Sequence, residues 1–110
     1  MQNVRLEYCI RETVDVNQLK SFGFKSRTNN TYILDKFLYR KIIKVKLIAD
    51  LAEKIITWEV YDCTNQKQYY AFYNNVNGDN NRVAVKSIEE FNKVVADLIE
   101  NKIIEEDEWR

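Results

Sequence analysis

Apolar and polar side chains alternate along residues 4–10, the first element that the sequence predicts. One side of this segment carries the apolar residues Val4, Leu6, Tyr8 and Ile10, and the other side carries Arg5, Glu7 and Cys9. A period of two residues is typical of a strand with one buried face. We therefore expect a half-buried strand at residues 4–10.

A short helix is predicted after this strand. Asp15 is a favourable N-cap residue, and apolar residues then recur at a spacing of three, at Val16, Leu19 and Phe22. Gly23 stands where many helices end in the left-handed conformation, and an aromatic residue follows it as the usual apolar contact. The pattern predicts a helix that begins after Asp15 and ends at Gly23.

Four further segments are rich in β-branched and aromatic residues, and we interpret them as strands: 31–39, 42–49, 54–62 and 68–74. The middle two are predicted to form a hairpin that closes near residues 50–53. The expected register pairs apolar residues on one face, namely Ile43 with Val60, Val45 with Trp58 and Leu47 with Ile56. On the other face it pairs Lys44 with Glu59 and Lys46 with Thr57. A one-residue slip would mix the two faces, which favours this sorting.

The last third of the chain predicts a turn and then a helix. Residues 74–82 contain Asn77-Gly78, a candidate hairpin tip, and residues 83–85 are expected to return as a short strand. Ser87 and Glu90 have the spacing of a capping box, which predicts a helix from Ser87 to about Asn101. Its apolar stripe recurs at helical spacing and comprises Ile88, Phe91, Val94, Val95, Leu98 and Ile99.

These elements predict an α+β fold, with a mostly antiparallel sheet of about five strands. A C-terminal helix should pack on the sheet face that carries Ile43, Val45 and Trp58, and a short helix should lie between the first two strands. The 110 residues, 45% of them hydrophobic, suit a single domain over residues 1–110. Residues 103–110 are expected to form an acidic, solvated C-terminal tail that contains Trp109.

Charge and cysteine content narrow the class of protein. The formal net charge is zero, so the composition gives no general affinity for nucleic acid or for an anionic membrane. The first 54 residues are nevertheless basic and the remainder acidic, which favours an asymmetric partner or head-to-tail association. Cys9 and Cys63 are expected to be reduced, independent thiols. With no signal peptide and no long apolar run, we expect a cytoplasmic protein without a membrane partner.

The amino-acid composition excludes most of the common kinds of catalytic site. The chain has no histidine, which excludes Ser-His-Asp and Cys-His catalysis and ordinary zinc sites. Two glycines are too few for a P-loop or a dinucleotide fingerprint. The only Glu-x-Lys motif, at Glu100 and Lys102, falls at a helix end, and the surroundings of Gly78 lack the oxygen ligands of a calcium loop. We expect no enzymatic activity, no metal and no cofactor.

One face of the predicted sheet is the candidate binding surface. In the expected register it carries Lys44, Lys46 and Tyr61, and the strand at 68–74 would add Tyr69 and Tyr73. Tyrosine and lysine on an exposed sheet suit stacking on bases and contact with phosphates in a single-stranded nucleic acid. The alternatives are a protein interface, or an ordinary surface that is either solvated, with Lys44 paired to Glu59, or covered by the first helix.

Two further features bear on partners. Arg40 and Lys41 lie at a predicted hairpin tip, where they are either solvated or in contact with an anion or an acidic partner. A protein-binding function also requires a second apolar or aromatic surface, which the sequence offers at Ile33, Phe37, Tyr39, Ile42 and Tyr61.

The segment from Glu12 to Lys25 resembles small uncharacterised proteins of phages and mobile elements in Gram-positive bacteria. Several of these begin with a strand, followed by a short helix capped by Val-Asp and ended by a Phe-Gly-Phe turn, as at Val14-Asp15 and Phe22-Gly23-Phe24 here. The resemblance covers roughly residues 5–40 and implies no activity. We expect a non-enzymatic accessory protein that binds an unknown protein partner or a second copy of itself. The alternative is a protein that binds single-stranded nucleic acid.

Overall fold

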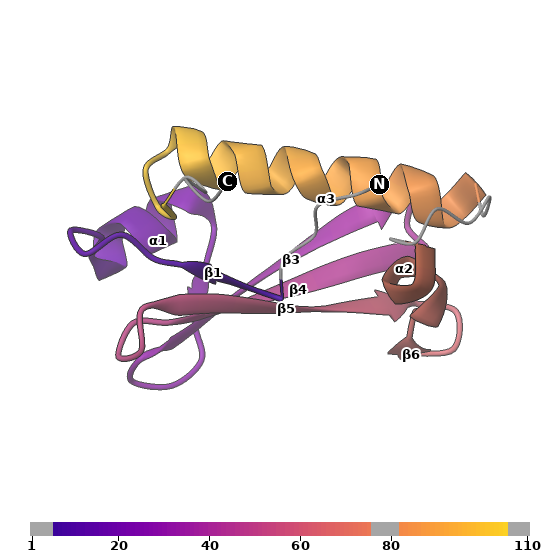
Figure 1. Ribbon diagram of the computed structural model, residues 1–110. Helices are drawn as coiled ribbons and strands as arrows, with labels where there is room; N and C mark the ends of the chain where they lie inside the picture. Colours follow the sequence, from indigo (N-terminus) through magenta and orange to yellow (C-terminus); the bar gives the residue numbers. More distant parts are fainter. Residues whose placement is uncertain (1–5, 76–81, 106–110) are drawn as a thin grey trace.

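The chain folds into an antiparallel sheet that is covered on one face by helices (Figure 1). This computed structural model describes residues 6–75 and 82–105. The described elements are β1 (Glu7–Cys9), α1 (Val16–Phe22), β2 (Lys25–Ser26), β3 (Thr31–Tyr39), β4 (Ile43–Asp50), β5 (Ile55–Asp62), β6 (Lys67–Gln68), α2 (Tyr70–Asn75) and α3 (Arg82–Glu100). The sheet order is β1-β5-β4-β3-β2, and β6 also pairs with β5. The predicted α+β class is confirmed.

Strands β4 and β5 follow the predicted alternation, but their register differs from the predicted one. Val45 lies opposite Val60, Leu47 opposite Trp58 and Lys46 opposite Glu59, which is a shift of two residues from the expected pairing. The faces are unchanged because a shift of two keeps every side chain on its side of the sheet. The cause is the longer turn after Asp50, whose carboxylate accepts hydrogen bonds from the amides of Ala52 and Glu53 at 2.9 and 3.1 Å.

Helix α1 begins and ends as predicted. The Asp15 carboxylate accepts the amide of Gln18 at 3.0 Å, and the Gln18 side chain accepts the amide of Asp15 at 3.2 Å, which forms a capping box. Gly23 adopts φ 127°, and the amide of Phe24 bonds back to the Leu19 carbonyl at 3.0 Å. This Schellman-type end satisfies the last carbonyls of the helix and turns the chain into β2.

Helix α3 starts earlier than the sequence predicted. Residues 83–85 are helical and not a strand, and Ser87 is buried inside the helix, where its hydroxyl donates to the Val83 carbonyl at 2.8 Å. Ser87 therefore bonds one turn back and does not cap a helix start. The predicted stripe does cover the predicted face, since Phe91 packs on Trp58 with ring centroids 5.2 Å apart. Val94 and Leu98 extend the contact along the core.

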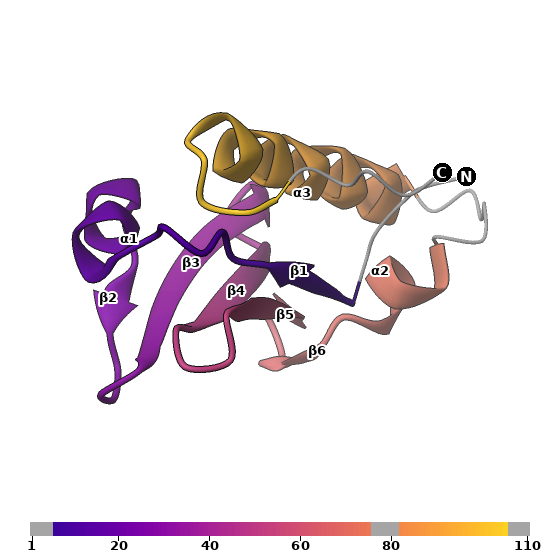
Figure 2. The same cartoon turned by 60° about the vertical axis from the view of Figure 1, so that its left-hand side comes forward.

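The strand predicted at 68–74 is wrong. Only Lys67–Gln68 pair with β5 as the short β6, and Tyr70–Asn75 form helix α2 on the same side of the sheet as α3 (Figures 1 and 2). The reason is tertiary, because Phe72 is fully buried between Trp58 and Phe91, with centroid distances of 5.4 and 5.6 Å. An aromatic cluster of this kind fixes the segment more strongly than its own strand propensity.

The two ends of the described chain meet at the β1 edge. β1 is shorter than predicted, and Leu6 is 80% exposed, whereas Tyr8 and Ile10 are buried as expected. Ile103 and Ile104 are buried and not part of a solvated tail, since Ile104 bridges to Ile10. The predictions for Val4 and Arg5, for the Asn77-Gly78 tip and for Trp109 fall outside the described residues. No described helix is long and apolar enough to cross a bilayer.

Candidate functional site

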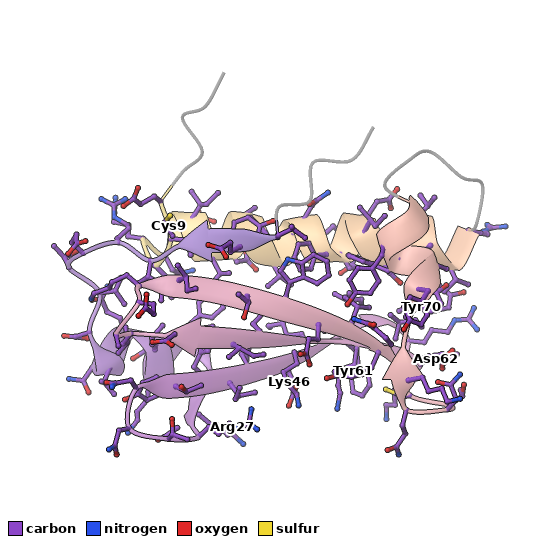
Figure 3. The ribbon with its side chains drawn as sticks, turned by 60° about the horizontal axis from the view of Figure 1, so that its bottom comes forward. Cys9, Arg27, Lys46, Tyr61, Asp62 and Tyr70 are labelled. Carbon is purple, nitrogen blue, oxygen red and sulfur yellow. The ribbon has the colours of Figure 1, made fainter. Side chains whose placement is uncertain are left out.

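The face of the sheet opposite the helices is the candidate site. Figure 3 looks onto this face, with α3 behind the sheet and with Lys46 and Tyr61 on the near side. The pairing of β3, β4 and β5 arranges its side chains in rows that run across the strands. One row contains Ile33, Ile48 and Thr57, the next contains Asp35, Lys46 and Glu59, and the third contains Phe37, Lys44 and Tyr61. We call these nine side chains the open face.

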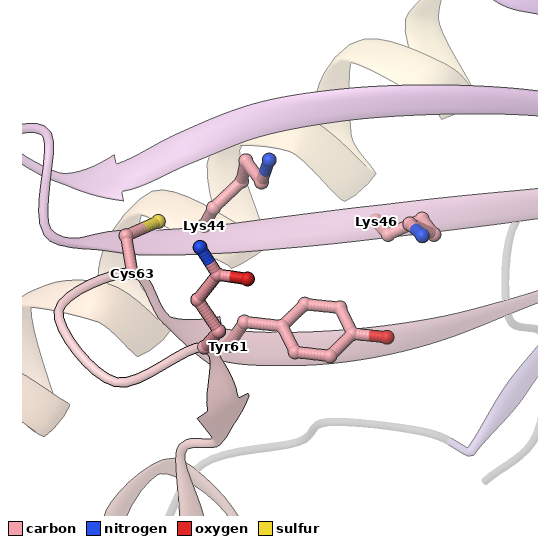
Figure 4. A pocket seen from close by; sticks show the side chains of 5 residues that line it. Lys44, Lys46, Tyr61 and Cys63 are labelled. Atoms are coloured by element: carbon pink, nitrogen blue, oxygen red, sulfur yellow. The ribbon is translucent and has the colours of Figure 1, made fainter.

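A shallow pocket of about 460 Å³ lies at one end of the open face (Figure 4). Lys44 and Lys46 from β4, Tyr61 from β5, and Cys63 and Gln66 from the following turn line it. Cys63 is held there because its amide bonds to the Ile42 carbonyl at 2.7 Å, which continues the β4–β5 ladder. The pocket thus combines two cations, an aromatic ring, a thiol and an amide.

The turn that carries Cys63 and Gln66 is built on Asp62. Its carboxylate accepts the Thr64 amide at 2.9 Å and the Thr64 hydroxyl at 2.5 Å. These two hydrogen bonds, the one from the hydroxyl first, lower the pKa of Asp62. Gln66 closes the turn with φ 60°, a left-handed conformation that only a minority of side chains adopt. An Asp-x-Thr turn signal after the strand was present in the sequence, but its link to a pocket was not predicted.

Tyr61 is tied to its neighbour on the same strand. Its hydroxyl donates a hydrogen bond to the Glu59 carboxylate, and this bond, with burial and the Glu59 charge, raises the pKa of Tyr61 to about 12. The Lys46 ammonium lies 5.6 Å from the centre of the Tyr61 ring. The phenol therefore stays protonated and fixed in orientation, with its ring presented to the pocket.

The two pocket lysines have no ion pair among the described residues. The salt bridges among the described residues lie on α3 instead, where they join Lys86 to Glu89 and Lys93 to Glu90. The predicted pairing of Lys44 with Glu59 is wrong, because Lys44 faces Tyr61 and Phe37 across the strands. Lys46 does lie between Glu59 and Asp35, yet it forms a salt bridge with neither. Both ammonium groups are available to an external anion.

Arg40 and Lys41 lie at the tip of the β3–β4 hairpin, as predicted, and at the same end of the sheet as the pocket. The register places Ile43, just after this tip, opposite Asp62, just before the pocket turn. Arg40 adopts φ 50°, and its guanidinium lies 5.2 Å from the centre of the Tyr39 ring. The tip therefore adds positive charge beside the lysines of the open face.

Tyr69 and Tyr73 do not belong to the open face. Tyr73 lies on the helix-covered side, where its ring stacks on Trp58 at 5.3 Å and its hydroxyl accepts the Val60 amide at 3.2 Å. The Tyr69 amide donates to the Val60 carbonyl at 2.8 Å, and its side chain packs against the core. Both tyrosines are structural, so the predicted aromatic platform is reduced to Tyr61 and, across the strands, Phe37.

The metal-ligand types are dispersed in the structure. Within residues 6–75 and 82–105, no three His, Cys, Asp or Glu side chains group so as to hold a metal ion. Cys9 and Cys63 are both free thiols, and they lie at opposite ends of the sheet.

Comparisons with known proteins give a fold and no function. No protein-family model matches the chain, and no curated protein matches it. Among solved structures, the fold is similar to a DUF1831 family protein from Lactobacillus plantarum, with a TM-score of 0.68 and 16% sequence identity. The similarity covers 94% of this chain and 90% of that protein. The whole architecture is thus shared with a protein of unknown function, at an identity that supports the fold alone.

Proposed function

We propose that this chain is a non-enzymatic accessory protein that binds a protein partner through the open face of its sheet. The observation that carries the proposal is the composition of a face that no described helix covers. Phe37 is 51% exposed there, and the half-buried Ile33 and Ile48 continue the apolar surface. Protein interfaces typically have an apolar, aromatic-rich core that is surrounded by a polar rim.

The charge pattern favours a protein over a nucleic acid. Lys44 and Lys46 suit phosphates, but Asp35 and Glu59 lie in the same row as Lys46 and would repel a phosphate backbone. The loss of Tyr69 and Tyr73 from the face also removes most of the stacking surface. A protein partner can match both signs of charge, whereas a nucleic acid can match only one.

Photo-crosslinking in the source cells tests this function. With p-benzoyl-phenylalanine in place of Phe37, we expect a discrete protein adduct, and with the same group in place of Lys93 on α3 we expect none. The double substitution Lys44→Glu and Lys46→Glu should reduce the adduct at least several-fold while the thermal midpoint is kept. An adduct of equal yield from both positions would contradict the proposal.

Nucleic acid is the alternative outcome of the same experiment. It would give an adduct that nuclease removes, together with binding of a labelled single-stranded oligonucleotide that weakens steeply with salt. A doubled mass in sedimentation, lost in the double variant, would identify a second copy as the partner.

The cytoplasm remains the proposed compartment because both cysteines are free thiols. Origin from a phage or mobile element stays a prediction.

A further inference from the structure

The two edges of the sheet differ in how completely their backbone groups are paired. On the β5 side, β1 pairs with residues 55–57 and β6 pairs with residues 61–62. Between them, Val60 is also bonded, because Tyr69 donates to its carbonyl and its amide donates to the Tyr73 hydroxyl. Exposed strand edges can pair with strands of other chains, and native proteins cover such edges or protect them with charged residues and bulges. On this edge, backbone bonds to described residues therefore involve residues 55–57 and 60–62.

The β3 side is open by comparison. β2 is two residues long and pairs only with Tyr32 and Ile33, although β3 continues to Tyr39 (Figure 2). Asp35, Lys36 and Phe37 are all exposed. No described residue bonds to the outer backbone groups of this stretch. A β-bulge between Phe37 and Tyr39 ends it.

The direction of the backbone groups follows from two hydrogen bonds. The Arg27 amide donates to the Thr31 carbonyl at 2.8 Å, so the backbone groups of Thr31 point toward β2. The Leu51 amide donates to the Asn30 carbonyl, so the Asn30 carbonyl points toward β4. Groups alternate along an antiparallel strand. Asp35 and Phe37 therefore turn their amides and carbonyls to the open edge, while Lys36 is bonded within the sheet.

We propose that this edge takes up an extended segment of a partner protein as an added antiparallel strand. A residue directly opposite Asp35 and another opposite Phe37 would each exchange two hydrogen bonds with β3. The β3 side chains determine which partner segment fits. Lys36 favours an acidic residue opposite it, and Phe37 favours an apolar residue opposite it. The inference rests on the proposed protein-binding function but uses the backbone edge of β3, which borders the open face at Asp35 and Phe37.

A second copy of the chain fits this edge poorly. In the two-fold arrangement that bonds all of these groups, Asp35 of one copy faces Phe37 of the other. Lys36 then lies directly opposite Lys36 of the second copy, and like charges in that position destabilise the pairing. The occupant we infer is therefore an acidic and apolar segment of a different protein. The bulge after Phe37 limits it to a few residues.

Hydrogen exchange on the free protein tests whether the edge is open. We expect rapid exchange of the Asp35 and Phe37 amides and slow exchange of the Lys36 and Val60 amides, measured residue by residue by NMR. Slow exchange at Asp35 and Phe37 in a monomer would show that the edge is already covered and would overturn the proposal, while leaving the open face untouched.

A synthetic peptide tests the recognition itself. The probe is the heptapeptide Thr-Thr-Val-Glu-Lys-Thr-Thr, whose Val, Glu and Lys are to lie opposite Phe37, Lys36 and Asp35. We expect chemical-shift changes centred on residues 34–38. N-methylation of the peptide Lys should weaken binding about tenfold, because it removes a hydrogen bond and blocks close approach. N-methylation of the Glu, whose amide points away from β3, should leave binding unchanged.

Protein variants provide the matching control. Asp35→Pro removes the amide that points to the open edge, and an edge strand tolerates proline at such a position. This variant should abolish the chemical-shift changes. The control Asp35→Asn should keep them. Lys44→Glu on the open face should also keep them, so that failure of the edge and failure of the open face are separable. Shift changes at Tyr61 in place of β3, or equal effects of both N-methylations, would overturn the inference.

Discussion

The hydroxyl of Tyr73 accepts the backbone amide of Val60 at 3.2 Å, so that a side chain bonds an edge amide of β5. The same hydroxyl accepts the Gln68 side-chain amide at 3.0 Å. The sequence predicted a strand where the structure has helix α2. The Tyr73 side chain of this helix makes the hydrogen bond that a neighbouring strand would have made. The helix gains this bond in addition to the packing of Phe72 on Trp58 and Phe91.

Removal of that hydroxyl should destabilise the fold. Tyr73→Phe leaves the Val60 amide without its partner, and we expect a loss of about 1–2 kcal/mol in the free energy of unfolding. Hydrogen exchange at Val60 should accelerate as well. The matched control is Tyr70→Phe, since Tyr70 is 65% exposed. Equal stability of the two variants in urea denaturation would contradict the role given to Tyr73.

The aromatic cluster and the open face should respond differently to truncation. Phe91 is fully buried against Trp58 and Phe72, so Phe91→Ala is expected to cost about 3–5 kcal/mol. Phe37 lies on the exposed side of the sheet, and Phe37→Ala should change stability by about 0.5 kcal/mol or less. Thermal and urea denaturation measure both. A large cost at Phe37 would show that its ring serves the fold and not a partner.

One left-handed residue offers a stabilising substitution. Lys102 follows α3 with φ 61°, and the next amide, that of Ile103, bonds back to the Leu98 carbonyl at 2.9 Å. Glycine adopts this conformation without strain, so Lys102→Gly should stabilise the protein by about 0.5–1 kcal/mol. The control Lys93→Gly, inside the helix, should destabilise it by about 1 kcal/mol. A rise in thermal midpoint in the first variant and a fall in the second is the expected result.

The Tyr61–Glu59 pair should be visible as an alkaline titration. The pKa of Tyr61 is raised from 10.0 to about 12, so the folded state holds this proton more tightly than the unfolded chain. The stability that results is complete below pH 10 and is lost as the pH rises through 12. Absorbance at the phenolate band, taken as the difference from Tyr61→Phe, measures the titration. Glu59→Gln should move the pKa back toward 10.0, and an unmoved value would exclude Glu59 as the cause.

Local pattern was sufficient for much of this fold. Alternation along β4 and β5 assigned Val45, Leu47 and Trp58 to the buried face and Lys44, Lys46 and Tyr61 to the open face, because the period of a strand is a local property. Asp15, Leu19 and Gly23 likewise determine α1, since cap and stripe lie within one short segment. The open face and its lysines were therefore predictable as a candidate site.

Tertiary structure determined the features that the hydrophobic pattern leaves open. A register shifted by two residues keeps every face, so only the turn built on Asp50 could select the pairing of Val45 with Val60. Residues 68–74 are rich in aromatic residues, which favour a strand, yet residues 70–75 are helical because Phe72 packs on Trp58 and Phe91. The pocket residues Cys63 and Gln66 and the open stretch of the β3 edge depend on which segments stop short of pairing. These contacts join residues far apart in the chain, and no local period encodes them.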